Sequence, residues 1–191
     1  MMQKPIATTR EATGMPTGRL AVWWLIASEI VIFGGVLASY LMQRFAHPEW
    51  AEAAAYTNTT AGAVNTFVLL TSSLSAVLAH NYAEQGQGKK AANFLWLTVF
   101  GAGVFLVIKT FEWTAEISHG YTIMSAGFWS FYYTAAGIHA AHVIVGAIIM
   151  MWVAGQARRG VELQRVELIG IYWHFVDLVW IFLFPLLYIA K

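Results

Sequence analysis

The amino-acid sequence predicts an all-α, polytopic integral membrane protein with five transmembrane helices. Its 191 residues are 59% hydrophobic and only 11% charged, and the mean hydropathy is +0.59. Soluble globular domains carry about 25% charged residues. The apolar residues also gather in five long runs, and a chain that crosses a hydrocarbon core forms helices there to satisfy its backbone hydrogen bonds.

The composition narrows the classes of function. The formal net charge is +1 and no basic run with interleaved aromatic residues is present, so no nucleic-acid partner is expected. The chain contains no cysteine, which excludes disulfide bonds, iron–sulfur clusters and thiolate copper sites made by this chain alone. Residues 1–19 are polar and lack the apolar core of a signal peptide, so they are predicted to form a cytoplasmic tail.

The first apolar run, residues 20–42, contains one ionisable side chain, Glu29, near its middle. At a rise of ~1.5 Å per residue the run spans roughly 33 Å, enough to cross a hydrocarbon core of about 30 Å. A carboxylate at that depth costs a few kcal/mol unless it is protonated or meets a partner on another helix. Glu29 therefore predicts a bundle of helices that it can face.

Residues 20–191 are predicted to form a single five-helix transmembrane domain. His47-Pro48 ends the first helix, since the residue before a proline disfavours the helical conformation. The remaining spans are expected at about 65–82, 92–111, 125–152 and 168–190. Eight Lys and Arg residues lie on the side of the N-terminal tail and two on the other side, so the positive-inside rule places the N-terminus inside and the C-terminus outside.

Ionisable side chains inside the spans predict an intramembrane polar belt. They are Glu29 in the first span, His139 and His142 in the fourth, and His174 and Asp177 in the fifth. From the helix rise, Glu29, His142 and Asp177 all lie roughly 14–15 Å from the inner surface. We expect Glu29 to hydrogen-bond a histidine of the fourth span, His142 first and His139 second.

These residues allow more than one interpretation. His139 and His142 could ligate a haem or a metal, but a catalytic metal site needs three or more converging ligands, which favours structural hydrogen bonding. Glu29 is either a proton carrier or an acid that only fixes helix packing. Lys109 and Glu112, three residues apart at the end of the third span, are interpreted as an interfacial pair.

Two other sets of residues carry expectations about packing. The nine tryptophans are expected mostly at span ends and on lipid-facing surfaces. Small residues allow close approach of helices in membranes, and six glycines are expected at such points. These glycines are Gly34, Gly35, Gly101, Gly103, Gly137 and Gly146.

Five segments, one in each predicted span, together carry a family resemblance. They are ASEIVIFGG (27–35), NTFVLLTSS (65–73), KTFEW (109–113), GIHAAHVIVG (137–146) and YWHFVDLVWIFLF (172–184). In this order they resemble subunit III of the haem-copper terminal oxidases, over nearly the whole chain from Leu20 onward. YWHFVDLVW, combined with the glutamate of the first span and the histidine pair of the fourth, is the most specific part.

The resemblance implies a non-catalytic subunit, with no active site, haem, copper or other metal of its own. In the family, subunit III packs against subunit I, which carries the haems and copper and reduces O2 to water while pumping protons. The implied partners are subunit I, subunit II, other oxidase subunits and bound phospholipid. The implied roles are assembly, stability, lipid binding and support of proton uptake, and Glu29 matches the family's carbodiimide-reactive intramembrane glutamate.

The length of this chain indicates which form of the family it resembles, and several alternatives for its function stay open. Longer family members have seven spans, so this chain looks like the five-helix bacterial form, located in the bacterial inner membrane. The electron donor stays open between cytochrome c and quinol. The alternatives are an accessory subunit of a nitric oxide reductase complex, a stand-alone proton-conducting membrane protein, and a membrane enzyme with a metal at the histidines.

Overall fold

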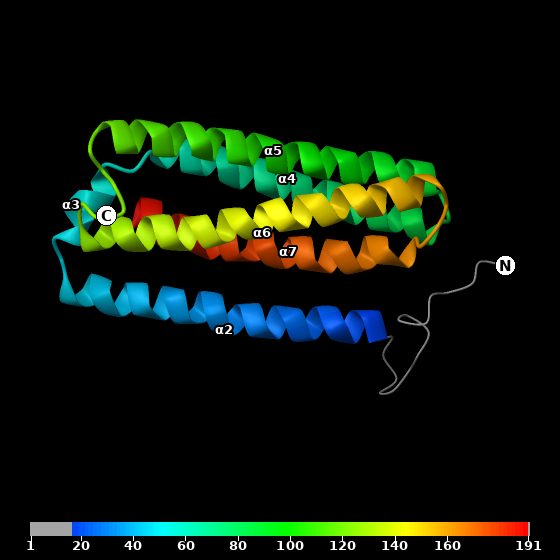
Figure 1. Ribbon diagram of the computed structural model, residues 1–191, viewed down its shortest axis with the longest axis horizontal. Coiled ribbons are helices and arrows are strands. Elements are labelled where there is room, and N and C mark those ends of the chain that lie inside the picture. The colour runs from blue at the N-terminus through cyan, green and yellow to red at the C-terminus, as the bar shows by residue number, and fades with distance from the viewer. Residues whose placement is uncertain (1–16, 191) are drawn as a thin grey trace.

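Long antiparallel helices lie side by side along the molecule in the computed structural model, which describes residues 17–190 (Figure 1). Five of them are long and apolar enough to cross a membrane. The helices are α2 (Thr17–Ala46), α3 (Trp50–Ala55), α4 (Thr59–Glu84), α5 (Gly88–Ser118), α6 (Gly127–Arg158), α7 (Gln164–Phe184) and the π-helical turn η1 (Pro185–Ile189). The all-α prediction is confirmed.

The observed helices extend beyond most of the expected spans. Thr17–Arg19, expected in the polar tail, belong to α2, and the rest of that tail, residues 1–16, lies outside the described residues. The last span ends at Ile189, where a π turn continues α7 through Pro185, because proline cannot donate the next α-helical hydrogen bond. The connector after α2 contains a short helix, α3, that the sequence analysis did not expect.

Local chemistry sets several helix ends. The side chain of Asn58 accepts a hydrogen bond of 3.0 Å from the Ala61 backbone N–H and caps the start of α4. The turns that follow α4 and α6 each contain a glycine with a left-handed backbone, Gly86 and Gly160, both at φ 72°. Such residues let the chain reverse direction in a few residues. As a result, α5 packs antiparallel to α4, and α7 packs antiparallel to α6 (Figure 1).

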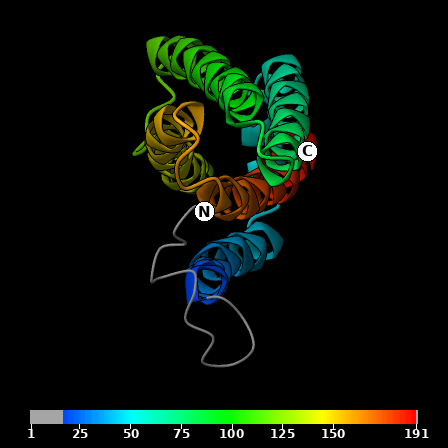
Figure 2. The same ribbon diagram turned by 90° about the vertical axis from the view of Figure 1, so that its right-hand side faces the viewer.

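Four of the long helices, α4 to α7, pack in a ring (Figure 2). Each helix of the ring packs on its two neighbours, because α4 also contacts α7. The interior is filled by large side chains such as Phe105, Tyr132, Trp173 and Trp180, each exposed by 1% or less. Trp173 and Trp180 lie in the middle of α7 and are buried, so the expectation that the nine tryptophans lie at span ends or on exposed surfaces is wrong for these two.

Helix α2 lies outside the ring, beside α7 and α6 (Figures 1 and 2). Its buried residues are Ile26, Phe33 and Tyr40, seven residues apart, so a single narrow stripe faces the ring. The opposite side is apolar and exposed, as Trp24, Val31 and Met42 show at more than 70% exposure. Much of α2 is therefore available to lipid or to another protein.

Glycines meet the packing expectation at two positions only. A Cβ added to Gly101 would lie 2.8 Å from Ser72 Cβ, and one added to Gly146 would lie 3.0 Å from the Tyr172 ring. The other four expected positions have no neighbour within 4 Å of such a Cβ among the described residues; they are Gly34, Gly35, Gly103 and Gly137. Within this chain, the expectation is wrong for those four.

Candidate functional site

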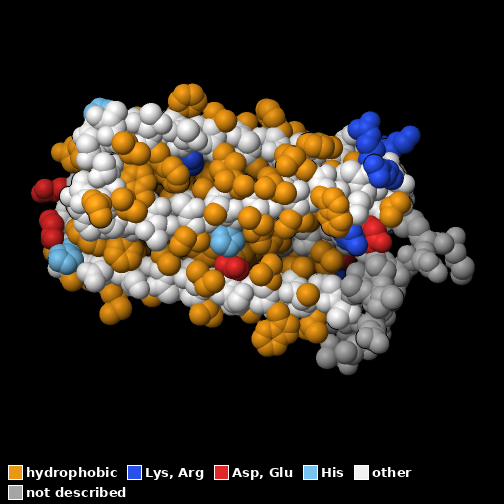
Figure 3. All heavy atoms as spheres, in the orientation of Figure 1, with side chains coloured by type: hydrophobic (Ala, Val, Ile, Leu, Met, Phe, Trp, Pro, Cys, Tyr) orange, Lys and Arg blue, Asp and Glu red, His pale blue; other side chains and the backbone are white. Residues whose placement is uncertain are grey.

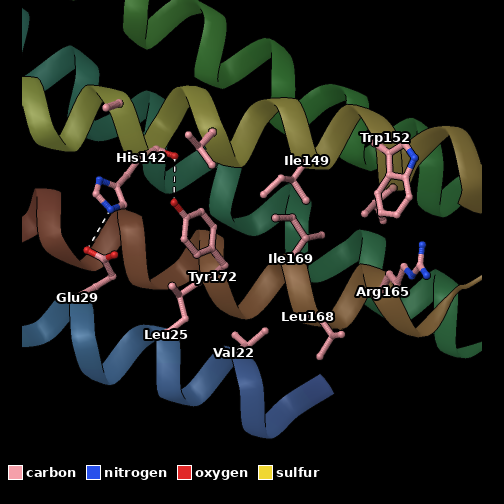
Figure 4. Close-up of a pocket in the computed structure, with 13 residues that line it drawn as sticks. Val22, Leu25, Glu29, His142, Ile149, Trp152, Arg165, Leu168, Ile169 and Tyr172 are labelled. Carbon is pink, nitrogen blue, oxygen red and sulfur yellow. Dashed lines mark hydrogen bonds and ion pairs between the residues drawn. The ribbon is translucent and has the colours of Figure 1, made fainter. Parts of the chain in front are cut away.

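The glutamate of α2 and a histidine of α6 point toward each other across the gap between the helices (Figure 4). Glu29 Oε2 lies 3.0 Å from His142 Nε2, the contact that the depth comparison predicts. The other ring nitrogen, Nδ1, lies 2.8 Å from the Ile138 carbonyl oxygen. Since a carbonyl only accepts, Nδ1 carries a hydrogen, and one further proton lies between Nε2 and Glu29. The pair has no net charge whichever atom holds that proton.

A groove of about 450 Å³ runs along α2 from this pair, between α6 and α7 (Figure 4). Its walls are mainly apolar, as Leu25, Ile149 and Ile169 illustrate. Arg165 lies at the opposite end from Glu29, with its guanidinium 4.7 Å from the centre of the Trp152 ring. The groove therefore has a neutral polar pair at one end and, at the other, an arginine that also pairs with Glu162, with Nε 3.4 Å from Oε2.

Polar contacts with α6, α7 and η1 attach α2 to the rest of the molecule. Arg19 Nε lies 2.6 Å from Glu167 Oε1 near one end of α2, and Glu29 contacts His142 near the middle. Toward the other end, the Tyr40 hydroxyl donates a hydrogen bond of 2.9 Å to the Leu186 carbonyl in η1. Because α2 packs along a narrow stripe, these contacts fix its position along the ring.

The other residues of the expected belt do not join the pair. His174 Nδ1 lies 2.6 Å from Ser73 Oγ, which links α7 to α4. His139 and Asp177 are buried, and neither has a hydrogen-bond partner among the described residues. The five residues are therefore one pair, one separate hydrogen bond and two unpartnered side chains rather than one network.

A second polar cluster lies inside the ring, around Lys109. We call Lys109, Glu112, Glu116, Tyr132 and Tyr188 the Lys109 cluster. Lys109 Nζ lies 3.2 Å from Glu112 Oε2 and 3.2 Å from the Tyr132 hydroxyl, and it also contacts the Tyr188 hydroxyl. The ion pair exists as predicted, and the protein encloses it, since Lys109 is 1% exposed and Glu112 5%. Its position at the membrane interface stays a prediction.

Sequence reasoning missed the other members of this cluster. Glu116 is 6% exposed and follows Lys109 by seven residues, so Lys109, Glu112 and Glu116 share one helix face. That spacing was a signal available in the sequence. Nothing in the sequence linked Tyr132 of α6 and Tyr188 of η1 to it, because both reach Lys109 through tertiary packing.

Comparison with known proteins decides the family. The family model for cytochrome c oxidase subunit III matches residues 11–191. This chain belongs to that family. The cytochrome c oxidase subunit 3 of Corynebacterium diphtheriae is 30% identical over 173 residues, which cover 87% of this chain and 84% of that protein.

Two further relatives differ in the complex that they name. The quinol oxidase subunit 3 of Bacillus subtilis is 28% identical over 196 residues, covering 91% of this chain and 88% of that protein. The haem-copper oxidase subunit I+III of Aeropyrum pernix is 30% identical over 184 residues, covering 90% of this chain and 22% of that protein. The chain is thus a subunit III of a haem-copper oxidase, a multi-pass protein of the cell membrane.

The His, Asp and Glu side chains that the structure describes are not grouped around a metal site. Across residues 17–190, no three His, Asp or Glu side chains are placed to hold one ion. His139 is enclosed by Phe105 and Trp180, whose ring centres lie 5.5 and 5.1 Å from its own. The geometry favours hydrogen bonding and packing as the roles of His142 and His139.

Proposed function

We propose that this subunit III packs against subunit I of its oxidase and carries out no redox chemistry itself. The relative from Aeropyrum pernix carries the proposal, because its name joins subunits I and III in one chain. The match covers 90% of this chain but only 22% of that protein, as expected for one part of a longer fusion. A fusion supports a lasting association between the two subunits.

The surface of the subunit supports this association. Helices α4 and α5 carry exposed aromatic side chains along their outer faces, including Phe67, Phe100 and Phe111, each about 70% exposed. In a membrane such faces meet either lipid or another helical protein, and close packing rather than the hydrophobic effect drives the association. We assign the subunit a role in assembly and stability of the oxidase on this basis.

The proposed orientation has the N-terminus inside the cell. Lys and Arg side chains gather at one end of the molecule, where the α4–α5 and α6–α7 turns lie (Figure 3). Lys89 and Lys90 lie at the start of α5, Arg158 and Arg159 at the end of α6, and α2 begins at the same end of the molecule (Figure 1). The positive-inside rule supports the assignment of this end to the cytoplasm. We extend the proposal, by resemblance, to support of proton uptake by subunit I from that side.

The groove beside α2 supports a role in lipid binding. Its apolar walls suit an acyl chain, and Arg165 at its end suits the phosphate of a phospholipid. Bound lipid would fill the space that the narrow stripe of α2 leaves open. The groove would then contribute to the attachment of α2.

Co-purification of the tagged chain tests the proposed association. We expect a haem-containing partner with the mass of subunit I, identified by mass spectrometry, and a visible haem spectrum that is lost when the partner is stripped away. A colourless chain without partners would support the stand-alone proton-conducting alternative. A coloured chain without partners would overturn the structural role of the histidines, and a nitric oxide reductase partner would move the subunit to that complex.

A further inference from the structure

We propose that the Lys109 cluster is a proton-binding site, with one exchangeable proton on Glu116. The inference depends on the contacts of five buried side chains and is independent of the proposed association with subunit I. The cluster joins α5, α6 and η1, so the contacts of its two tyrosines are fixed by packing between elements.

The Tyr132 hydroxyl lies between two carboxyl groups. Its oxygen is 2.8 Å from Glu112 Oε1 and 3.1 Å from Glu116 Oε1. A hydroxyl has one hydrogen to donate, so it can serve only one of these two oxygens well. If both carboxyls were ionised, the other contact would place two lone pairs against each other. A proton on one carboxyl turns that contact into a hydrogen bond.

Glu116 is the carboxyl that lacks donors of its own. Glu112 Oε2 receives a hydrogen bond from the Lys109 ammonium at 3.2 Å. The nearest further hydroxyl to Glu116 is that of Tyr133, 3.5 Å from Oε2, but Tyr133 lies only 2.7 Å from the Tyr121 carbonyl oxygen. A carbonyl can only accept, so the single Tyr133 hydrogen is used there. A protonated Glu116 donates to Tyr132, which donates to Glu112.

The charges of the cluster lead to the same assignment. Lys109 supplies one positive charge, and two ionised carboxylates would leave a net charge of −1 in a site where all three side chains are at most 6% exposed. Burial of an uncompensated charge is strongly unfavourable, whereas a proton on Glu116 makes the site neutral. The titratable groups of the cluster around Glu116 are Lys109, Glu112, Tyr132, Tyr133 and Tyr188. His119, Tyr56 and Tyr121 line the same cavity as Glu116.

A pocket gives the proton a path to the aqueous phase. A cavity of about 380 Å³ at the C-terminal end of α5 is lined by both Glu112 and Glu116. Asn58 and the exposed His119 line the same cavity, so water can reach the Glu116 carboxyl past polar side chains. The C-terminal end of α5 is opposite to the end of the molecule where the Lys and Arg side chains gather (Figures 1 and 3). Glu116 would exchange its proton there.

Infrared difference spectroscopy of the full-length subunit, purified with its partners, tests the assignment. Wild type and Glu116→Gln are compared in the region of the protonated carboxyl C=O stretch. We expect the variant to lose one band, equivalent to one carboxyl per chain, and we expect that band to shift when wild type is transferred to D2O. Glu52→Gln, an exposed carboxyl in α3, is the matched control and should leave the band unchanged.

Aspartate variants locate the proton within the cluster. Glu116→Asp should change the frequency of the band, and Glu112→Asp should leave it close to wild type. If the band is identical in Glu116→Gln, or does not respond to D2O, the site does not exist as proposed. A shift in Glu112→Asp without one in Glu116→Asp overturns the assignment to Glu116. Should Glu116→Gln fail to fold, Tyr132→Phe still tests the proposal, because loss of its hydrogen bond should raise the band frequency.

Discussion

Glu29 Oε2 and His142 Nε2 lie 3.0 Å apart and join α2 to α6 near the middle of both helices. Phe33, one turn further along α2, packs edge-on against the same imidazole, with ring centres 5.1 Å apart. The histidine is therefore held by its own helix through Ile138, by an acid and by an aromatic ring. This neutral pair thus helps to fix the depth at which α2 meets the ring, together with the contacts of Arg19 and Tyr40.

The first prediction concerns substitution of Glu29. Glu29→Gln keeps a group that can donate to His142 Nε2, so we expect a change in stability within about 1 kcal/mol, as for other hydrogen bonds between membrane helices. Glu29→Lys adds a charge without a counterion and should cost about 3 kcal/mol. The measurements are the thermal midpoint in detergent and the amount of subunit in the membrane.

Ser28→Ala is the control for Glu29, since the Ser28 hydroxyl donates a hydrogen bond of 2.6 Å to the Leu25 carbonyl of its own helix. It should behave as wild type in both measurements. Failure of Glu29→Gln to accumulate in the membrane would argue against a neutral, hydrogen-bonded acid.

The second prediction concerns Tyr40, which attaches α2 to the C-terminal turn. Tyr40→Phe keeps the buried ring and removes the hydrogen bond of 2.9 Å to the Leu186 carbonyl. We expect a loss of about 1 kcal/mol, the usual net contribution of such a bond. Because this contact holds the C-terminal part of α2 against η1, its loss should loosen the α2–α3 connection. Cleavage of that connection by protease should then become faster.

Tyr56→Phe provides the comparison for Tyr40, because the Tyr56 side chain is 63% exposed. Its cleavage rate should match wild type. Equal rates for all three proteins would show that the hydroxyl of Tyr40 does not hold α2 in place.

The contacts of Glu29 could be predicted because they depend on depth. Long apolar runs define where each helix begins, and the helix rise then places Glu29 and His142 at one level. Depth does not give the rotation of a helix about its axis. Asp177 lies at a similar expected depth, yet it has no partner among the described residues. Which side chains meet depends on rotation and tilt, which packing decides.

The interior of the ring was harder to predict for the same reason. Lys109 and Glu112 are close in sequence, so their pairing was foreseen, but their burial depends on Tyr132 and Tyr188, which come from distant segments. The glycines show this too. Gly101 and Gly103 are two residues apart on α5 and cannot be told apart by composition, yet only Gly101 meets a neighbouring helix within this chain.

That pair of glycines gives the third prediction. Gly101→Ala would bring its Cβ to 2.8 Å from Ser72 Cβ on α4, so the helices must separate and the thermal midpoint should fall. Overpacking of this kind costs about 1–3 kcal/mol. Gly103→Ala has space and should be neutral or slightly stabilising, because alanine is the better helix former.

Measurement of both alanine variants in the same detergent makes Gly103→Ala the control for Gly101→Ala. Equal midpoints for the two would mean that α4 and α5 do not approach as closely at Ser72 as the structure shows.

The fourth prediction concerns the charge balance around Lys109. Lys109→Met keeps much of the side-chain volume but leaves Glu112 buried without its cation, which should cost about 3–5 kcal/mol. Adding Glu112→Gln removes the uncompensated carboxylate, so the double variant should recover part of that loss. Thermal midpoints of the two variants and of wild type measure the recovery, and Lys89→Met, at an exposed position near the start of α5, should leave the midpoint unchanged. If Lys109→Met proved as stable as wild type, or if the double variant were less stable than Lys109→Met, the ammonium would not be the group that balances Glu112.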